Sequence, residues 1–430
     1  MISNLKKLIH SDFAKNIAWL TGGTAISQAI TILASVVITR LYSDEDFGVF
    51  TLYVSILSVL LIVSSLKLEQ AIPITSKPRS TMNLVALNFM ILLMTSIILL
   101  IISLFFSKLI SDWLDVPKIE KYIFLIPIGV FFGGSYSILY QWALKEKVFK
   151  LITRTKITQG VGLSIGKIGI GLIKATPFGL IFGHIIGKSS GVFSLARIFY
   201  RKNKDNFNLI SKHGMSSMFH RFKQFPLLTL PAQLLSTGGL QLPVFLITAH
   251  YGVDTVGQFG LSEMIVGLPV VLIGTAVGDV FYAEVAENGK RNPEKILRLS
   301  NKLILKLIAL GVFPMVVLLF FGPFLFTFVF GENWQLAGEL AQVLGVLAFF
   351  RLVFTPVSRV YILYERHLAE LLFNMFRITV VVASFGIAKI FDLEVINAVI
   401  IYAVGMSIVY FFIYLYAQLI IKQQIKIGTK

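Results

Sequence analysis

Long apolar runs, separated by short polar stretches, dominate the pattern of the chain. The run from Ile91 to Phe106 is apolar on every face of a helix, whereas the strands of a membrane barrel alternate apolar and polar positions. About twelve runs reach the roughly 20 residues that a helix needs to cross a bilayer core. The pattern predicts an all-α membrane protein with about 12 transmembrane helices: 16–39, 45–66, 81–106, 121–144, 151–173, 178–199, 225–249, 255–276, 303–329, 336–363, 369–390 and 395–421.

An eleven-residue motif occurs once in each half of the chain. Tyr42–Leu52 and Tyr251–Leu261 share a tyrosine, a glycine, a phenylalanine and a leucine in register, at Tyr42/Tyr251, Gly48/Gly257, Phe50/Phe259 and Leu52/Leu261. Because each copy follows one apolar run and opens another, we expect a duplicated bundle, an architecture found in many membrane transporters. The prediction is two six-helix lobes, residues 1–200 and 225–430, joined by a basic cytoplasmic connector at 201–224.

Composition and charge support a membrane location. Hydrophobic residues make up 56% of the chain and charged residues only 14%, well below the roughly 25% of soluble domains. The net charge of +17 would suggest nucleic-acid binding in a soluble protein, but here the basic residues cluster in short loops. That distribution predicts contact with membrane lipids and no nucleic-acid partner.

The basic residues also predict an orientation. Of the 39 lysines and arginines, 29 fall on the side of the predicted spans that holds both termini, which the positive-inside rule assigns to the cytoplasm. Both copies of the motif then lie outside. The two halves have parallel topology, related by an axis along the membrane normal. In a bacterium this corresponds to the inner membrane.

Four basic residues remain inside the predicted spans: Lys167, Lys188, Arg351 and Arg377. A charge at the centre of a membrane helix costs about 2.5–3.5 kcal/mol even on the permissive scale, so we expect these side chains to line a cavity or meet a partner. Because cations outnumber acids there, and because lysine and arginine bind phosphate, the expected cavity suits an anionic substrate.

Four further titratable residues are candidates for ion coupling or charge balance: Glu263, Asp279, Glu69 and His184. They would either couple transport to a proton or Na⁺, or neutralise nearby cations. Structural alternatives remain for several members of both sets. Lys188 can extend its amine to the membrane surface, Asp279 can end the eighth span, and Glu69 can pair with Lys67.

Glycines recur at four-residue spacing in the fifth and sixth predicted spans. They are Gly162 and Gly166 in one, and Gly183, Gly187 and Gly191 in the other. Small residues at this spacing allow two membrane helices to approach closely.

Catalytic signatures are not recognisable in the sequence. The chain has no cysteine, which excludes disulfides and thiolate metal sites. It shows no nucleotide-binding Gly-Lys-Ser loop, no histidine pair at metal-ligand spacing and no defensible Ser/His/Asp set. We therefore expect a transporter without a cofactor or metal, and not an enzyme.

The stretch from Arg40 to Phe50, the copy from Tyr251 to Phe259, and the following Leu268–Phe281 resemble bacterial polysaccharide-unit flippases. These are the O-antigen and capsule repeat-unit translocases of the multidrug/oligosaccharidyl-lipid/polysaccharide exporter superfamily. The similarity covers nearly the whole chain through its length, number of spans and repeat.

The resemblance implies a MATE-like fold whose two lobes surround a central cavity that opens alternately to each side. It implies an undecaprenyl-diphosphate-linked oligosaccharide as substrate, moved to the outer leaflet of the inner membrane, and a polysaccharide polymerase as a protein partner. Two alternatives remain open: an ion-coupled exporter of small molecules with the same fold, and a membrane polysaccharide polymerase or ligase. The longest expected outer loop, Ser107–Glu120, is short for an external catalytic surface.

Overall fold

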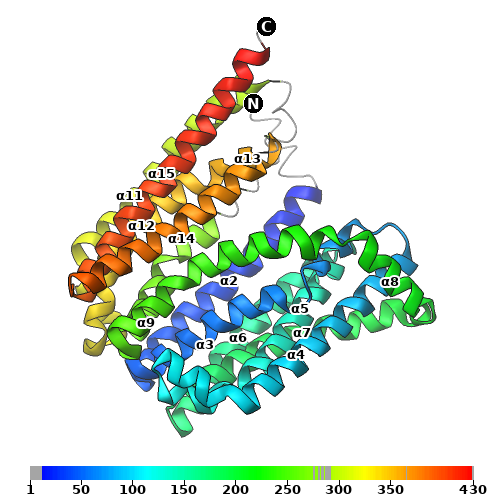
Figure 1. The fold of residues 1–430 in the computed structure, drawn as a ribbon, viewed down its shortest axis with the longest axis horizontal. Helices are drawn as coiled ribbons and strands as arrows, with labels where there is room; N and C mark the ends of the chain where they lie inside the picture. Colours follow the sequence, from blue (N-terminus) through cyan, green and yellow to red (C-terminus); the bar gives the residue numbers. More distant parts are fainter. Residues whose placement is uncertain are drawn as a thin grey trace. The chain divides into compact units, whose positions relative to one another are not determined.

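The computed structural model describes residues 12–274, 277–278, 281, 285, 292–364 and 366–428, and the elements formed by these residues are helices (Figure 1). Two compact units divide the chain, Met1–Gly238 and Gly239–Lys430, called here the first and second unit. The all-α class predicted from the apolar runs is confirmed. The predicted lobe boundaries, 1–200 and 225–430, stay a prediction. The division between the two units falls after Gly238, inside the helix Leu230–Val266.

The helices of the first unit follow the first six predicted spans. They are α2 (Asp12–Leu41), α3 (Asp44–Val63), α4 (Pro78–Leu114), α5 (Leu125–Lys145), α6 (Phe149–Ile173) and α7 (Pro177–Asn203). One boundary differs from expectation: α4 continues to Leu114, so most of the predicted outer loop Ser107–Glu120 is helical. Eight further residues of an already apolar helix extend it by about 12 Å, which carries it beyond the bilayer core.

The predicted connector is also more ordered than its polar composition suggests. A short 3₁₀ turn, η3 (Lys204–Leu209), leads into α8 (Lys212–Arg221), which packs against α4. The Asn83 side chain of α4 donates to the Leu209 carbonyl and accepts from the Ser211 amide, at 2.9 Å each. These two hydrogen bonds satisfy backbone groups where the chain turns into α8.

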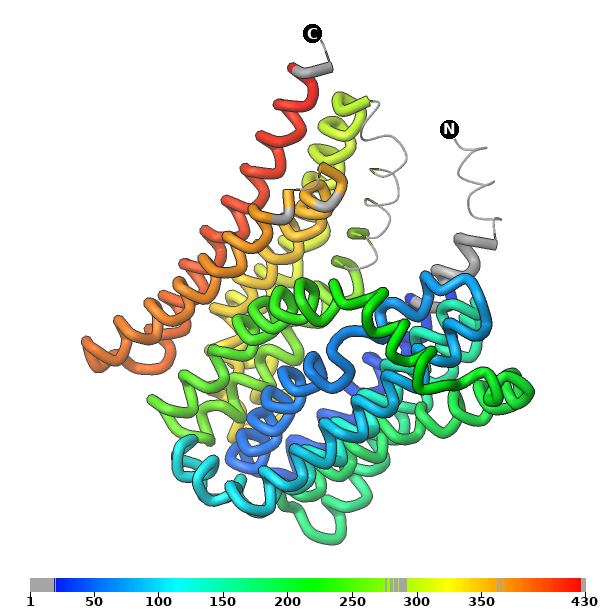
Figure 2. Tube along the Cα trace, turned by 45° about the vertical axis from the view of Figure 1, so that its right-hand side comes forward, coloured from blue at the N-terminus to red at the C-terminus, as the bar shows by residue number. Residues whose placement is uncertain are grey.

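The second unit contains the larger part of α9 (Leu230–Val266), followed by α11 (Pro293–Phe330), α12 (Gln335–Phe354), α14 (His367–Ile390) and α15 (Val395–Gly428). The predicted seventh span, 225–249, begins five residues before α9, and the eighth, 255–276, extends past the end of α9 at Val266, with its last two residues outside the described part of the chain. α9 is interrupted at Gly252, where φ is +86°. α14 and α15 run side by side in opposite directions (Figure 2). Trp334, Phe326 and Phe385 are among the largest fully buried side chains of this unit.

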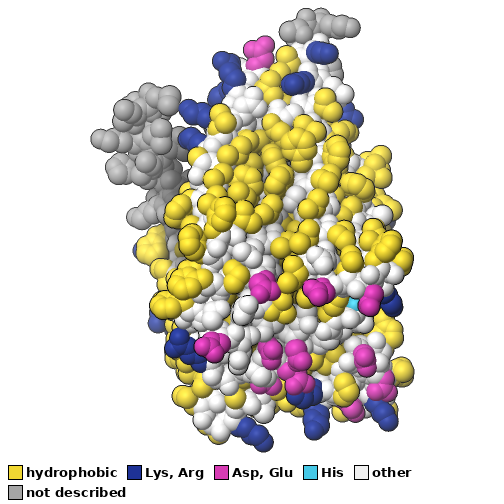
Figure 3. Space-filling view, turned by 90° about the vertical axis from the view of Figure 1, so that its left-hand side faces the viewer, with side chains coloured by type: hydrophobic (Ala, Val, Ile, Leu, Met, Phe, Trp, Pro, Cys, Tyr) yellow, Lys and Arg dark blue, Asp and Glu magenta, His cyan; other side chains and the backbone are white. Residues whose placement is uncertain are grey.

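Among the described residues, nine helical segments are long and apolar enough to cross a membrane. On the face shown in Figure 3 hydrophobic side chains form a broad area, lysine and arginine side chains lie both above and below it, and most acidic side chains lie in the lower part. Helices satisfy all their backbone groups internally, which the hydrocarbon core demands. The chain is a multi-pass membrane protein.

Glycines bring α6 and α7 into close contact, as their spacing predicted. A β-carbon at Gly166 would lie 2.9 Å from the Gly183 α-carbon, and one at Gly187 would lie 3.0 Å from the Gln159 carbonyl oxygen. A β-carbon at Gly183 would lie only 2.5 Å from the Lys167 backbone nitrogen. The backbones of the two helices therefore meet without side chains between them.

We predict that Gly183→Ala destabilises the protein, because the added methyl group meets rigid backbone and must separate the helices. Overpacking of this kind costs about 1–3 kcal/mol. Thermal unfolding of the purified protein in detergent should show a melting temperature several degrees lower. Gly169→Ala is the matched control on α6, since a β-carbon there meets nothing within 4 Å. Equal melting temperatures for the two variants would contradict the prediction.

Candidate functional site

Lys167 lies on α6 in the interior of the first unit, with only 6% of its surface exposed. Its Nζ sits 3.8 Å from the centroid of the Phe50 ring on α3. The negative face of an aromatic ring attracts an ammonium group, by about 2 kcal/mol where water is excluded. The described residues provide no carboxylate partner for this amine. An aromatic ring thus holds the charge without neutralising it.

His184 and Lys188 lie one turn apart on α7, and His184 contacts the Phe50 ring. The His184 imidazole packs edge-on between Phe50 and Tyr53, with centroids 5.9 and 6.3 Å away, and its buried Nδ1 has no hydrogen-bond partner. Lys188 is half-buried, and its carbonyl accepts a long bond of 3.5 Å from the Gln159 amide of α6. The structure therefore brings together three of the predicted residues, Lys167, His184 and Lys188, around the α6–α7 contact.

A fourth basic residue, Lys156, belongs beside this group, although the sequence sorted it with the cytoplasmic loop cations. It lies within α6, half-buried, and its amine donates to the Thr24 hydroxyl at 2.7 Å. The amine is also 5.8 Å from the Tyr140 ring. Lys156 precedes Lys167 by eleven residues, about three helical turns, so both occupy one face of α6. That spacing is the signal by which the sequence could have found it.

Three lysines thus form a row in the first unit: Lys156, Lys188 and Lys167, called here the lysine row. Lys156 and Lys188 are close enough for their charges to interact, as are Lys188 and Lys167 with His184. Like charges at short range in a medium of low dielectric constant repel strongly. The arrangement is therefore one that an anion would stabilise.

Two more predicted residues meet in the second unit. Glu263 on α9 and Arg351 on α12 line a cavity of about 30 Å³ together with Tyr402 and Tyr410 of α15. The described residues show no direct ion pair between them, but their charges interact across this space. A cavity of this size has room for about one water molecule, which could bridge the two groups.

Arg377 on α14 lies beside the ring of Tyr410, which also lines this cavity. Its guanidinium lies 4.9 Å from the centroid of Tyr410, and Nη1 donates to the Asn374 side chain at 3.2 Å. Its Nε is buried without a hydrogen-bond partner. Tyr410 therefore links Arg377 to the cavity of Glu263 and Arg351, and these residues are called here the glutamate–arginine cluster.

Glu69 joins neither group. Glu69 is 2% exposed, accepts from the Ser65 hydroxyl at 2.6 Å and pairs with Lys67 at 3.7 Å. This is the structural alternative that the sequence left open for it. Asp279 lies outside the described residues.

The repeated tyrosines do equivalent work in the two units. Tyr42 donates to the Lys167 carbonyl of α6 at 2.7 Å, and Tyr251 donates to the Leu393 carbonyl just after α14 at 2.9 Å. By order along the two halves, α6 and α14 are the fifth and eleventh predicted spans, so each tyrosine binds near the end of the fifth span of its half. Burial and the nearby Asp46 carboxylate raise the pKa of Tyr42 to about 12. The hydroxyl remains a donor at any physiological pH.

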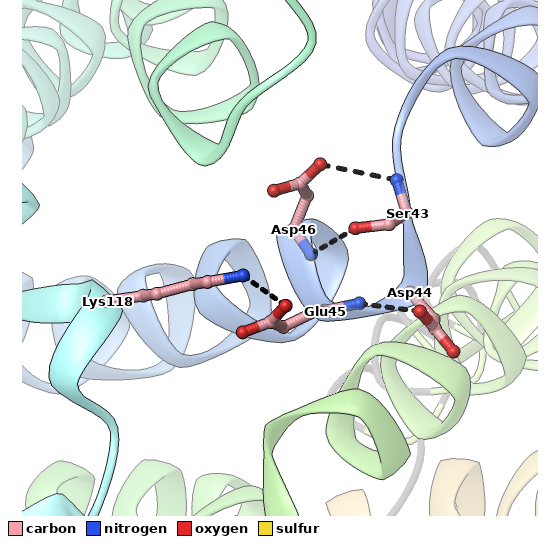
Figure 4. Close-up of polar contacts among 5 residues, drawn as sticks. All are labelled: Ser43, Asp44, Glu45, Asp46 and Lys118. Atoms are coloured by element: carbon pink, nitrogen blue, oxygen red, sulfur yellow. Dashed lines mark hydrogen bonds and ion pairs between the residues drawn. The ribbon is translucent and has the colours of Figure 1, made fainter.

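The acidic residues after Tyr42 define how α3 begins (Figure 4). Ser43 and Asp46 form a capping box, in which each side chain bonds the other residue's backbone amide, at 3.1 and 3.3 Å. Glu45 forms an ion pair with Lys118, in the 3₁₀ turn η2 (Pro117–Tyr122) that follows α4. Acidic side chains in the first turn also interact favourably with the helix dipole. The cap fixes where Phe50, two turns later, presents its ring to Lys167.

Both copies of the motif place their phenylalanine at a charged group of residues. The ring of Phe50 contacts the Lys167 amine, and Phe259 lines the cavity of Glu263 and Arg351. The sequence identified the motif as a repeat but did not connect it with the buried charges. A comparison of the spacing between the motif and the buried charges in each half would not have revealed this connection, because the charges lie on different helices in the two units.

Comparison with known proteins identifies a family and a relative. Residues 37–338 match the family described as "Polysaccharide biosynthesis protein". The teichuronic acid biosynthesis protein TuaB of Bacillus subtilis (strain 168) is 25% identical over 270 residues, which is 61% of this chain and 53% of that protein. The match thus spans about half the length of this relative.

Two solved structures share the fold. An inward-facing conformation of a multidrug resistance MATE family transporter of the MOP superfamily aligns with a TM-score of 0.74 at 15% identity, covering 93% of this chain and 96% of that one. The lipid II flippase MurJ in an inward closed conformation aligns with a TM-score of 0.71 at 15% identity, covering 92% and 86%. The fold is MATE-like, as the resemblance implied.

We predict that Glu263 and Arg351 are energetically coupled. Glu263→Gln should lower the stability of the protein, because it leaves the Arg351 charge uncompensated, and adding Arg351→Met should recover part of the loss. Residues that share a cavity typically show couplings of about 0.5–3 kcal/mol, measurable by unfolding of both single variants and the double variant in detergent. Glu332→Gln, at an exposed position, should add to Arg351→Met without coupling. If the stability changes of Glu263→Gln and Arg351→Met were also strictly additive, the interaction would be refuted.

Proposed function

The chain belongs to the polysaccharide biosynthesis protein family, and we propose that it is a flippase for an undecaprenyl-diphosphate-linked oligosaccharide. It would carry this lipid from the cytoplasmic to the outer leaflet of the inner membrane by alternating access. The observation that carries the proposal is the lysine row, a set of buried or half-buried amines for which the described residues provide no carboxylate. The proposed activity is transport and not catalysis.

The chemistry of a diphosphate suits this arrangement. Burial makes each unneutralised amine costly, and an anion that approaches recovers part of that cost through charge-assisted hydrogen bonds. An organic cation would instead be repelled by the same amines. The fold alone does not choose between these cargoes, since a multidrug transporter shares it, and the sign of the buried charge is what favours the diphosphate in this proposal.

The second unit would contribute differently. Arg377 keeps a buried Nε without a partner, so its guanidinium has capacity for a further acceptor, such as a phosphate oxygen. Arg351 has Glu263 within electrostatic range, and we assign Glu263 to charge balance rather than to ion coupling. In this proposal the oligosaccharide follows the head group, and the polyprenyl tail remains in the bilayer. Both termini are in the cytoplasm.

Loss of a single cation should stop transport. We expect Lys167→Met and Arg377→Met each to abolish surface glycan while the amount of protein in the membrane stays unchanged. Lipid-linked repeat units should then accumulate in the cytoplasmic leaflet, which labelling of intact cells and of inverted vesicles can distinguish. Lys174→Met, at the exposed end of α6, is the matched control and should transport normally. Normal glycan in both variants would remove the assigned roles.

Lys156 provides a separate test of the lysine row. Lys156→Met should slow the appearance of surface glycan, because one amine of the row is lost. Lys156→Arg should retain most of the rate, since the positive charge and the hydrogen bond to Thr24 can both persist. A purely structural role would give the opposite pattern, with the longer guanidinium disturbing the packing and the methionine tolerated.

A further inference from the structure

A groove of about 490 Å³ lies between α14 and α15 of the second unit, apart from the glutamate–arginine cluster. Its floor contains Phe373, which stacks on Tyr361 at 6.1 Å with an interplanar angle of 3° and meets the edge of Tyr416 at 5.9 Å. The Tyr361 hydroxyl in turn donates to the Ile413 carbonyl of α15. Three interlocked rings make the floor a fixed surface.

One wall of the groove is a ridge of apolar side chains on α14. Leu368, Leu372 and Phe376 follow each other at four-residue spacing and are 68%, 56% and 44% exposed. Residues at this spacing stand above one another on a helix face. In a bilayer such a surface is covered by hydrocarbon chains.

Among the described residues, Arg366 is the one charged side chain that lines the groove, and it lies at one end. Arg366 immediately precedes α14, is exposed, and has no ion-pair partner among the described residues. The acid of the next turn, Glu370, is exposed but does not line the groove. An arginine at a membrane surface attracts anionic lipid by about 1 kcal/mol.

The length of the groove matches one leaflet. Arg366 and Phe376 are ten residues apart, so the lined part of α14 spans about 15 Å. That is half of the roughly 30 Å hydrocarbon core, whereas a polyprenyl chain is far longer. We propose that this groove binds an anionic phospholipid, with its phosphate on Arg366 and one acyl chain along the ridge of Leu368, Leu372 and Phe376. The groove shares no lining residue with the cavity of Glu263 and Arg351.

A second groove in the same unit offers a matched comparison. It has a volume of about 540 Å³ between α11, α12 and α15, and its lining is mainly apolar, with Val346 and Ile400 among its residues. Its charged residue is Glu339 instead of an arginine. This groove would accept a hydrocarbon chain but would not favour an anionic head group.

The absence of cysteine from the chain allows a local measurement. A single thiol introduced by Phe376→Cys, labelled with a fluorophore, reports lipid in the α14–α15 groove, and Val346→Cys reports the comparison groove. The full chain is placed in nanodiscs of zwitterionic lipid with increasing amounts of phosphatidylglycerol or phosphatidylcholine that carries a quenching nitroxide on the acyl chain. The concentration that quenches half of the fluorescence is measured for each lipid.

We expect phosphatidylglycerol to quench the label at Phe376→Cys at a concentration about fivefold lower than phosphatidylcholine does, the factor that one interfacial arginine supplies. Arg366→Ala should abolish this preference and Arg366→Lys should keep it, while the label at Val346→Cys should show none. Equal quenching by both lipids, or a preference that survives Arg366→Ala, would overturn the proposal. Displacement of phosphatidylglycerol by substoichiometric undecaprenyl phosphate would also overturn it, because the occupant would then be the substrate lipid. A flippase inactivated at Lys167 should still show the phospholipid preference, so the two proposals fail separately.

Discussion

The approach of α6 to α7 is the constraint on which the interior of the first unit depends. Glycines on both helices let backbone meet backbone, so Lys167 and His184 emerge at the contact instead of being separated by packed side chains. Tyr42 then occupies the end of this contact, where Gly171 and Gly179 leave room for its ring. Because the first copy of the motif holds α6 through this hydroxyl and Lys167 through Phe50, it fixes the buried amine twice.

Aromatic rings take the place that carboxylates usually hold beside buried cations. A carboxylate would neutralise Lys167 and satisfy it permanently, whereas the Phe50 ring attracts the amine while leaving its net charge in place. The cost of that residual charge remains in the folded protein, and a diphosphate would relieve it on binding. A transport site must bind its substrate and also release it. A partial stabilisation by rings meets both requirements better than a strong ion pair does.

The sequence predicted the helices well because hydrocarbon imposes one rule on all of them. Apolar runs of sufficient length become helices. The elements that the prediction missed are those formed by hydrogen bonds of polar residues instead. The helix α4 continues to Leu114 because its polar end carries on an established hydrogen-bond pattern, and Asn83 holds the chain at Leu209 and Ser211, just before α8 begins. Among the candidate residues, burial of charge found Lys167 but not Lys156, since a lysine two turns inside a helix is indistinguishable from a loop cation in a hydropathy plot. The pairing of Glu69 with Lys67 depended on a local turn that hydropathy does not describe.

The two units use one motif for two electrostatic purposes. In each, the tyrosine binds near the end of the fifth span and the phenylalanine stands beside buried charge, so the duplicated framework is the same. The first unit adds only basic groups to that framework, whereas the second adds Glu263 beside Arg351. In the proposed flippase an anion would therefore meet uncompensated charge in both units, at the lysine row and at Arg377, whereas Arg351 has an acid within electrostatic range. The same motif thus stands beside a different set of charges in each unit: basic groups alone in the first, and one acid with two arginines in the second.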